Sequence, residues 1–280
     1  MFDYYSEVVL LTRSDYTDEL ECWINWYLNI LQFDHIVIYD NNSSISIPSI
    51  ITKFPKDKIE YHFIQGWPNQ YQLYTNHVRQ SKASWIMALD DDEYLYIGEK
   101  FNHNIRNLID YLYTTYKKNK YYFLWVNMFS PEYHRTRTGL YINTHTSYSY
   151  SVCRRIHSSY PWGNDMGKSL INNQFDYEYS FSKDLGHIPR CLNGDNTTLL
   201  YDGTKVNSVR VNTLDKIQEE CFIAHYQYKS DSDWELKCSR PVASSQSYNL
   251  KSKKHIYRKL YEYKDKFKSC TLLKDLNLSK

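Results

Sequence analysis

The sequence predicts an α/β fold in which helices flank a mixed, mostly parallel β-sheet. Strand-like and helix-like segments alternate through the first half of the chain, which is typical of a largely parallel sheet with covering helices. Polar clusters also stand directly after several expected strands, where open sheets of this class bind ligands. The chain of 280 residues is long enough for one large domain, and we expect a single domain.

The first strand is expected at residues 8–11, and Thr17 is expected to cap the helix that follows it. Acidic side chains in the first turn favour a helix N-terminus because they interact well with the helix dipole; they are Asp18, Glu19 and Glu21. Apolar side chains then recur at helical spacing and should face the sheet; they are Trp23, Tyr27, Ile30 and Leu31.

Three further strands are expected at residues 36–39, 59–64 and 85–89. A polar turn at residues 40–44 follows the first of these. Pro68 suits the first position of the helix that precedes the strand at 85–89. That helix should run through Tyr71, Tyr74 and Val78.

The second half of the chain is less regular. An amphipathic helix is expected over residues 101–116 and strands over 121–128 and 221–224. Residues 130–220 are polar and rich in Tyr and Asn, which is typical of a variable substrate-binding face. Residues 250–267 predict a basic amphipathic helix packed on the domain, with peripheral contact to an anionic membrane as a secondary hypothesis.

The composition is that of a folded, soluble protein, with 42% hydrophobic and 24% charged residues. A formal net charge of +2 argues against a nucleic-acid partner. The six cysteines are scattered without a C-x-x-C pair, and no segment is long enough for a signal peptide or a membrane span. We therefore expect reduced thiols and a cytoplasmic protein. The frequent Tyr, Asn, Lys and Ile residues indicate an AT-rich genome.

Four consecutive carboxylates, Asp90, Asp91, Asp92 and Glu93, follow the strand at residues 85–89. They cannot all stay ionised side by side without a cation, so this acidic run predicts a metal site. Alternation along a strand would point Asp90 and Asp92 to one side and Asp91 and Glu93 to the other. Oxygen ligands suit Mg²⁺ or Mn²⁺. The alternative is a solvated acidic turn, and the apolar residues on both sides favour the metal site.

Polar residues after three of the expected strands should converge on one crevice. They are Thr12 with Arg13, Asp40 with Asn41, and the acidic run. Because ligands bind beyond the carboxyl ends of strands in open α/β sheets, this crevice is the expected binding site.

Another polar group follows the strand at residues 221–224. Ser232 and Glu235 form an S-x-x-E capping box, so a helix should begin there. Lys229 and Ser230 would then lie just before the helix N-terminus, where an ammonium, a hydroxyl and free backbone N–H groups can bind phosphate oxygens.

Three other residues could extend this group. Lys237 and Arg240 would place positive charge on one side of the same helix. His225, at the end of the strand, is either a third metal ligand or a structural histidine. As a ligand it would favour Mn²⁺ over Mg²⁺.

The order and spacing of these segments resemble the glycosyltransferases of family 92 and their family-2-like relatives. The matching residues are Asp40-Asn41-Asn42-Ser43-Ser44, then Trp85-Ile86 with Asp90, Asp92, Glu93, Tyr94 and Leu95, then His225-Tyr226 with Lys229, Ser230, Trp234, Lys237 and Arg240. The resemblance implies a GT-A fold, a nucleoside diphosphate sugar as donor, with a UDP-sugar favoured, and Mn²⁺ or Mg²⁺ bridging the diphosphate. It also implies transfer to a glycan, glycoprotein or glycolipid with inversion at the sugar carbon.

By position, the resemblance implies that Asp92 is the principal metal ligand, that Asp90 holds the ribose or the metal, and that His225 completes the metal shell. The other implied donor-binding residues are Thr12, Arg13, Asp40, Gln72, Asn76, Asp91, Lys229, Ser230, Lys237 and Arg240. The acceptor-side residues are Trp125, Lys168 and His187. Inversion requires a general base for the acceptor hydroxyl, and the candidates are Glu132 and Asp165.

We therefore expect one GT-A domain over residues 1–245, with a nucleotide-sugar-binding half at 1–128 and an acceptor-side half at 129–245, followed by a basic helix at 246–280. Two alternatives remain. A sugar nucleotidyltransferase would normally need a glycine-rich phosphate loop after the first strand, and residues 11–15 contain no glycine. A non-catalytic glycan-binding module would have no use for a diphosphate site.

Overall fold

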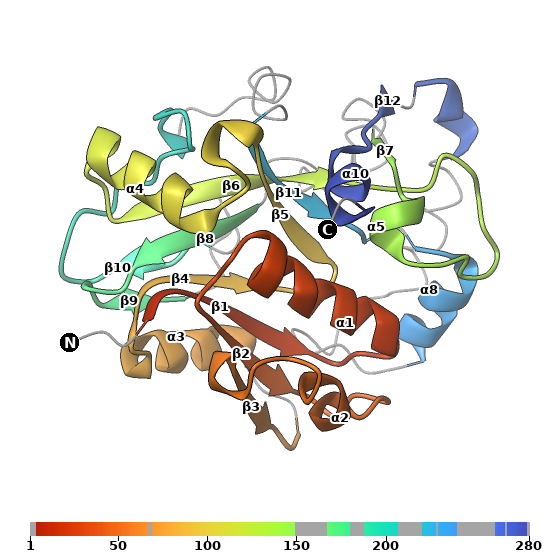
Figure 1. Cartoon of the computed structure of the whole chain (residues 1–280), viewed down its shortest axis with the longest axis horizontal. Helices are drawn as coiled ribbons and strands as arrows, with labels where there is room; N and C mark the ends of the chain where they lie inside the picture. Colours follow the sequence, from red (N-terminus) through yellow and green to blue (C-terminus); the bar gives the residue numbers. More distant parts are fainter. Residues whose placement is uncertain are drawn as a thin grey trace.

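The computed structural model describes residues 4–66, 69–148, 167–179, 188–206, 220–227, 229–239, 261–266 and 268–278. The main sheet contains β1 (Tyr4–Thr12), β2 (His35–Asp40), β3 (Ile59–Phe63), β4 (Ala83–Leu89), β5 (Glu93–Ile97), β6 (Lys120–Asn127), β8 (Gly167–Asn172) and β11 (Cys221–His225). Helices lie on both faces of this eight-stranded sheet (Figure 1), so the predicted α/β fold class is confirmed.

The strand order is β3-β2-β1-β4-β8-β6-β11-β5. The first four strands are parallel, β11 is parallel to β6, and β8 and β5 are antiparallel to their neighbours. Three strands separate β4 from β5 in this order, although only residues 90–92 connect them. Such a link spans at most about 14 Å, whereas four strand spacings in a flat sheet need about 19 Å. The sheet therefore curls, and the acidic run lies where it curls.

Alternating residues of β1 divide the core between the two faces of the sheet. Val8 and Leu10 pack with α1 (Thr17–Asn25), with the π-helical turn η1 (Trp26–Ile30) that continues it, and with α4 (Ile105–Tyr116). Val9 and Leu11 pack against α3 (Gln70–Gln80) on the opposite face. This division follows from the two-residue period of a strand.

Two helix starts differ from the prediction. Tyr16 is the residue before α1 and Thr17 is its first helical residue, so Thr17 does not cap it. α3 begins after Asn69, whose side chain accepts hydrogen bonds from the N–H groups of Tyr71 and Gln72. This asparagine cap sets the register of the helix. Pro68 lies outside the described residues.

β8 comes from the segment in which the sequence showed little pattern. A Cβ atom at Gly167 would stand 1.9 Å from the carbonyl oxygen of Phe123 on β6, so only glycine allows the two strands to approach this closely. The next residue, Lys168, is thereby held at the centre of the sheet.

The smaller elements are α2 (Ile47–Ile51), α5 (Tyr141–Thr144), α8 (Asp231–Cys238) and α10 (Leu272–Leu278), the 3-10 helices η2 (Lys56–Lys58), η3 (Glu99–Phe101) and η6 (Tyr261–Lys266), and the paired strands β9 (Tyr177–Glu178) with β10 (Arg190–Cys191) and β7 (Ser147–Tyr148) with β12 (Lys268–Ser269). The helix predicted through residue 267 is not continuous, because residues 261–266 form η6. The described C-terminal helix is instead α10, which buries Leu273 and Leu276. Residues 240–260 lie outside the described residues.

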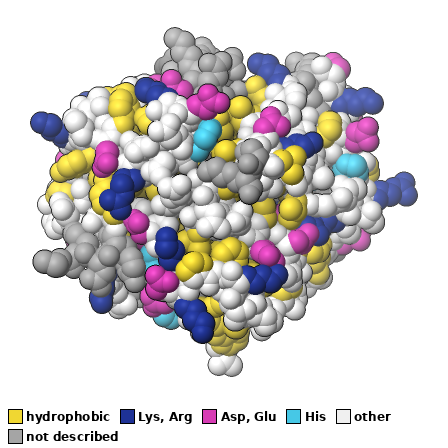
Figure 2. All heavy atoms as spheres, in the orientation of Figure 1, with side chains coloured by type: hydrophobic (Ala, Val, Ile, Leu, Met, Phe, Trp, Pro, Cys, Tyr) yellow, Lys and Arg dark blue, Asp and Glu magenta, His cyan; other side chains and the backbone are white. Residues whose placement is uncertain are grey.

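On the face shown in Figure 2, Lys and Arg side chains are interspersed with Asp and Glu side chains, in keeping with the net charge of +2. Among the described residues, none of the helices combines the length and the apolar character that a bilayer crossing requires.

Candidate functional site

The ends of three parallel strands meet at one edge of the sheet. Thr12, at the end of β1, donates its hydroxyl to Asp91 Oδ2 at 2.6 Å, and Ser14 Oγ donates to the same oxygen at 2.8 Å. The N–H of Asn41, after β2, donates to the Thr12 carbonyl at 2.7 Å. The expected convergence of residues 12–13, 40–41 and 90–93 is therefore confirmed.

The acidic run is a turn, so strand alternation does not govern it. The Glu93 N–H donates to the Asp90 carbonyl at 3.1 Å and closes the turn between β4 and β5. Asp90, Asp91 and Asp92 consequently point toward three different sets of partners. The predicted pairing of Asp90 with Asp92 on one side is wrong.

Asp90 and Glu93 face a buried lysine. Lys168 Nζ lies 3.0 Å from Asp90 Oδ2 and 3.3 Å from Glu93 Oε2, and the lysine side chain is 2% exposed. Burial alone would lower the pKa of Lys168, but Asp90 and Glu93 raise it, and the net pKa is well above its usual value. Gln70, at the start of α3, donates to Asp90 Oδ1 at 3.0 Å. Lys168, predicted on the acceptor side, therefore lies against the acidic run.

Asp92 faces the segment that follows β11. Its Oδ1 lies 3.6 Å from His225 Nε2, and its Oδ2 lies 3.8 Å from Lys229 Nζ. The antiparallel register of β5 and β11 pairs His225 with Glu93 and so brings the histidine to this turn. Burial would lower the pKa of Lys229, but Asp92, Asp91 and Glu19 raise it above its usual value. Lys229 is therefore an ammonium at neutral pH.

The side chains at this turn fit a metal site that is completed by substrate phosphates and water better than a site built from protein ligands alone. In the described part of the chain, no set of three or more His, Cys, Asp or Glu side chains is arranged to hold a metal ion. Asp90 contacts Lys168, which leaves Asp92 and His225 as neighbouring ligands of the predicted set. Mg²⁺ and similar ions commonly take one or two protein ligands and complete their shell with substrate phosphates and water. The Asp92–His225 pair fits an ion of that kind.

The N-terminus of α8 is already capped by protein groups. Ser230 Oγ accepts the Asp233 N–H at 3.3 Å, and Asp233 Oδ2 accepts the Ser230 N–H at 2.9 Å. The N–H groups of Asp231 and Ser232 donate to carbonyls in the loop after β6, at 3.2 and 3.0 Å. The capping box thus begins two residues earlier than predicted. The predicted binding of phosphate by Ser230 and free N–H groups is not supported, because these groups are used within the protein.

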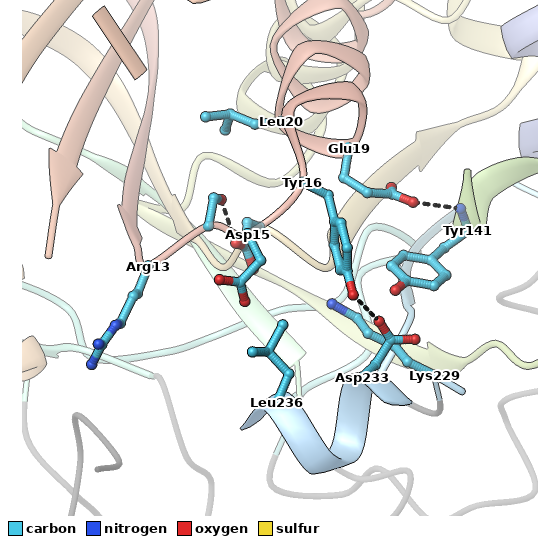
Figure 3. A pocket seen from close by; sticks show the side chains of 11 residues that line it. Arg13, Asp15, Tyr16, Glu19, Leu20, Tyr141, Lys229, Asp233 and Leu236 are labelled. Carbon is cyan, nitrogen blue, oxygen red and sulfur yellow. Dashed lines mark hydrogen bonds between the residues drawn. The ribbon is translucent and has the colours of Figure 1, made fainter. Parts of the chain in front are cut away.

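A pocket lies beside the acidic run, between the first turn of α1 and α8 (Figure 3). Tyr16 reaches across it and donates its hydroxyl to Asp233 at 2.7 Å, and Glu19 accepts the Tyr141 N–H at 2.9 Å. The lining combines carboxylates, two cationic side chains and aromatic rings, and consists of Arg13, Ser14, Asp15, Tyr16, Glu19, Leu20, Asp91, Tyr141, Lys229, Asp233 and Leu236. Such a lining can bind a polar ligand that carries both hydroxyl and anionic groups.

Arg137 connects the loop after β6 to this pocket. It donates to Asp18 at 2.7 Å and to Glu19 at 2.9 Å, and its guanidinium lies 4.4 Å from the centre of the Tyr16 ring. Burial raises the pKa of Glu19 even beside this arginine. The contacts fix the loop against the first turn of α1.

Several predicted donor-site residues have other surroundings. Asp40 accepts the Ser43 N–H at 2.8 Å and the Tyr61 hydroxyl at 3.0 Å, so its carboxylate shapes the turn after β2. Gln72 and Asn76 lie exposed on α3, whereas Gln70 of that helix reaches Asp90.

The remaining predicted residues fall into two groups. Arg13 lines the pocket, the Trp125 ring lies 4.4 Å from that of His225, and Glu132 is exposed on the loop after β6. Asp165, His187 and Arg240 lie outside the described residues, and so does the side chain of Lys237. Their roles stay predictions.

The sequence reasoning missed several pocket residues. Ser14 and Tyr16 lie a few residues after the first predicted strand. A search for polar residues slightly farther beyond the strand end would have found them. The pattern S-x-x-D at residues 230–233, a possible capping box, would have indicated Asp233. Tyr141 carried no signal, because it reaches the pocket only through the fold of the loop after β6.

Comparison with known proteins gives only distant likenesses. No protein-family model and no curated protein matches the sequence. Among solved structures, S. aureus TarS is similar with a TM-score of 0.32 and 12% identity over 60% of this chain, which spans only 28% of that chain. TarS 1-349 is similar with a TM-score of 0.36 and 10% identity, covering 92% of this chain and 70% of that one. A putative glucose-1-phosphate thymidylyltransferase from Bacillus anthracis has a TM-score of 0.34 and 8% identity, covering 60% and 72%.

Proposed function

We propose that this chain is a glycosyltransferase of GT-A type that moves a sugar from a nucleoside diphosphate sugar, with a UDP-sugar favoured, to a hydroxyl of a glycan, glycoprotein or glycolipid. The observation that carries the proposal is the meeting of Asp91, Asp92, His225 and Lys229 at the carboxyl edge of the sheet. Ligands of open α/β sheets bind at that edge. An ammonium, carboxylates and aromatic rings together match a ligand with phosphate, hydroxyl and ring components.

Lys229 is the group proposed to bind the diphosphate. Its pKa is raised by the surrounding carboxylates, so it carries its charge at neutral pH. The ammonium lies 4.9 Å from the centre of the Tyr141 ring, which restricts its position. A positioned positive charge stabilises the negative charge that develops on a leaving diphosphate.

Asp92 and His225 are the residues proposed to hold a divalent cation, Mn²⁺ or Mg²⁺. When bound, the cation would neutralise charge on the leaving diphosphate. On the acceptor side, Glu132 and Asp165 stay the proposed general bases for an inverting transfer. The pocket beside Lys229 offers Asp91, which is anchored through one oxygen, as an acceptor for ligand hydroxyl groups.

Calorimetric titration with UDP, with and without Mn²⁺, tests the proposal. We expect metal-dependent binding that weakens at least about tenfold, or ~1.4 kcal/mol, in Asp92→Asn. Asp195→Asn is the matched control, because that carboxylate is 45% exposed and pairs with Lys118. Absence of metal-dependent binding of both UDP and GDP would contradict the proposal.

Turnover assays separate the proposal from its two alternatives. A panel of nucleotide sugars should show metal-dependent donor hydrolysis, which needs no known acceptor. Pyrophosphate release from a nucleoside triphosphate and a sugar phosphate would indicate a nucleotidyltransferase instead. Binding of glycans without any nucleotide binding would indicate a glycan-binding module.

A further inference from the structure

Lys168 is a buried cation in direct contact with the acidic run. Its ammonium lies 3.0 Å from Asp90 and 3.3 Å from Glu93, and its side chain is 2% exposed. The close pairing of β8 with β6, which requires glycine at position 167, fixes the lysine at this place. A buried ammonium is strongly unfavourable without carboxylate partners, so the three side chains form one unit.

This unit divides the acidic run. Asp90 is held through both oxygens, by Lys168 on Oδ2 and by Gln70 on Oδ1. Glu93 is 0% exposed and accepts the Asp90 N–H at 2.9 Å. Asp92 instead faces His225 and Lys229. Asp90 and Glu93 therefore share one counter-charge that the protein itself supplies.

The backbone of the run is held by donors from two other parts of the chain. Trp23 Nε1 donates to the carbonyl oxygens of Asp90 and Glu93, at 3.2 and 3.1 Å. The Tyr226 N–H donates to the Asp92 carbonyl at 2.8 Å and joins the run to the end of β11. With its backbone fixed in this way, the direction of each carboxylate depends on the partner that its side chain meets.

We infer that Lys168 is a positioning residue that withholds Asp90 and Glu93 from the ligand, so that the acidic run presents Asp92 to the cation and diphosphate of the donor. This inference rests on the proposed function and deepens it. The sequence pattern suggests a metal site with Asp90 and Asp92 as joint ligands. With Lys168 in place, Asp90 acts through the lysine and not on the metal.

A double-variant experiment distinguishes these two roles of Asp90. Mn²⁺-dependent UDP affinity is measured by calorimetry in Asp90→Asn, Lys168→Met and the double variant. Asp90→Asn leaves Lys168 with Glu93 as its carboxylate partner, so its ammonium is less firmly held and opposes the cation, and we expect at least tenfold weaker binding. The double variant removes both charges and should return to within about threefold of the wild-type affinity. If Asp90 is a metal ligand, the double variant will bind as weakly as Asp90→Asn, which would overturn the inference.

A matched control uses the neighbouring carboxylate. Asp92→Asn should stay weak when it is combined with Lys168→Met, because Asp92 faces His225 and Lys229. Recovery of Asp92→Asn by the lysine change would show a general charge effect and would also overturn the inference.

Urea unfolding of the same variants measures the coupling of Asp90 with Lys168 without any ligand. The two single variants should lower the unfolding midpoint. The double variant should lie above Lys168→Met, because it leaves one carboxylate without the lysine, Glu93, where Lys168→Met leaves two. Strictly additive losses would overturn the unit of Asp90 and Lys168. If wild-type protein binds no UDP, the proposed function fails, while the unfolding midpoints still test whether Asp90 and Lys168 act as one unit.

Discussion

At the scale of single residues, the partner of a side chain decides its role more than its place in the sequence. Asp90, Asp91 and Asp92 are consecutive, yet they face a buried lysine, two hydroxyl groups, and a histidine with a second lysine. Each partner comes from a different element of the fold. The acidic run is therefore three local environments and not one uniform cluster.

Lys229 provides a prediction at this scale. We expect Lys229→Met to bind UDP at least about tenfold more weakly in the presence of Mn²⁺, because a hydrogen bond to a charged group contributes roughly 1.5–3 kcal/mol. Calorimetry measures the change. Lys118→Met is the control, since Lys118 pairs with Asp195 and its side chain is 33% exposed. An equal loss in the two variants would show a non-specific charge effect.

At the scale of elements, α8 shows how a helix N-terminus can be closed to ligands. Its first N–H groups bind Ser230 and carbonyls of the loop after β6, and its first turn carries Asp231 and Asp233. The acidic side chains interact with the positive end of the helix dipole, which would otherwise attract phosphate. Lys229, just before the helix, is therefore the group of this segment that we propose to bind an anion.

The capping box of α8 gives a prediction of stability. Ser230→Ala removes the acceptor of the Asp233 N–H, and we expect a loss of about 1 kcal/mol in the free energy of unfolding. Glu235→Ala alters the residue that the sequence pattern had placed in the box, and we expect a loss of only a few tenths of a kcal/mol. Urea unfolding measures the two values. A larger loss for Glu235→Ala would support the original position of the box.

At the scale of the whole molecule, a buried carboxylate joins β1, β2 and α3. Glu7 Oε1 accepts from His77 at 2.8 Å and from Ser81 at 2.6 Å, and Glu7 Oε2 lies 2.8 Å from His35 Nδ1. Burial raises the pKa of Glu7, but the hydrogen bonds from His35, His77 and Ser81 lower it to about 2. The group stabilises the parallel half of the sheet at a distance from the candidate site.

This lowered pKa predicts how stability depends on pH. The folded-state pKa lies below the unfolded value, so the contribution is present above about pH 4.5 and is lost as the pH falls toward 2. Glu7→Gln should therefore lower the free energy of unfolding by about 3 kcal/mol at pH 7, with a difference that shrinks below pH 4.5. Urea unfolding over a pH series measures it. Glu60→Gln, at a 55% exposed carboxylate beside His62, should show little difference at any pH.

Much of the fold and part of the site were open to prediction. The strands at 8–11, 36–39, 59–64 and 85–89 have strong apolar patterns, and the polar ends of the first, second and fourth meet as the strand-end rule requires. β8 was missed because its placement depends on Gly167 and on partners distant in sequence.

The sequence by itself determined the parallel half of the sheet, the helices beside it and the edge at which polar groups collect, because these follow from local periodicity and chain connectivity. Only the tertiary structure decided which partner each carboxylate faces. Lys168 reaches Asp90 through the pairing of β8, and His225 reaches Asp92 through the register of β5 with β11. Long-range strand pairing sets those contacts, and these partners of the acidic run lie far from it in the sequence.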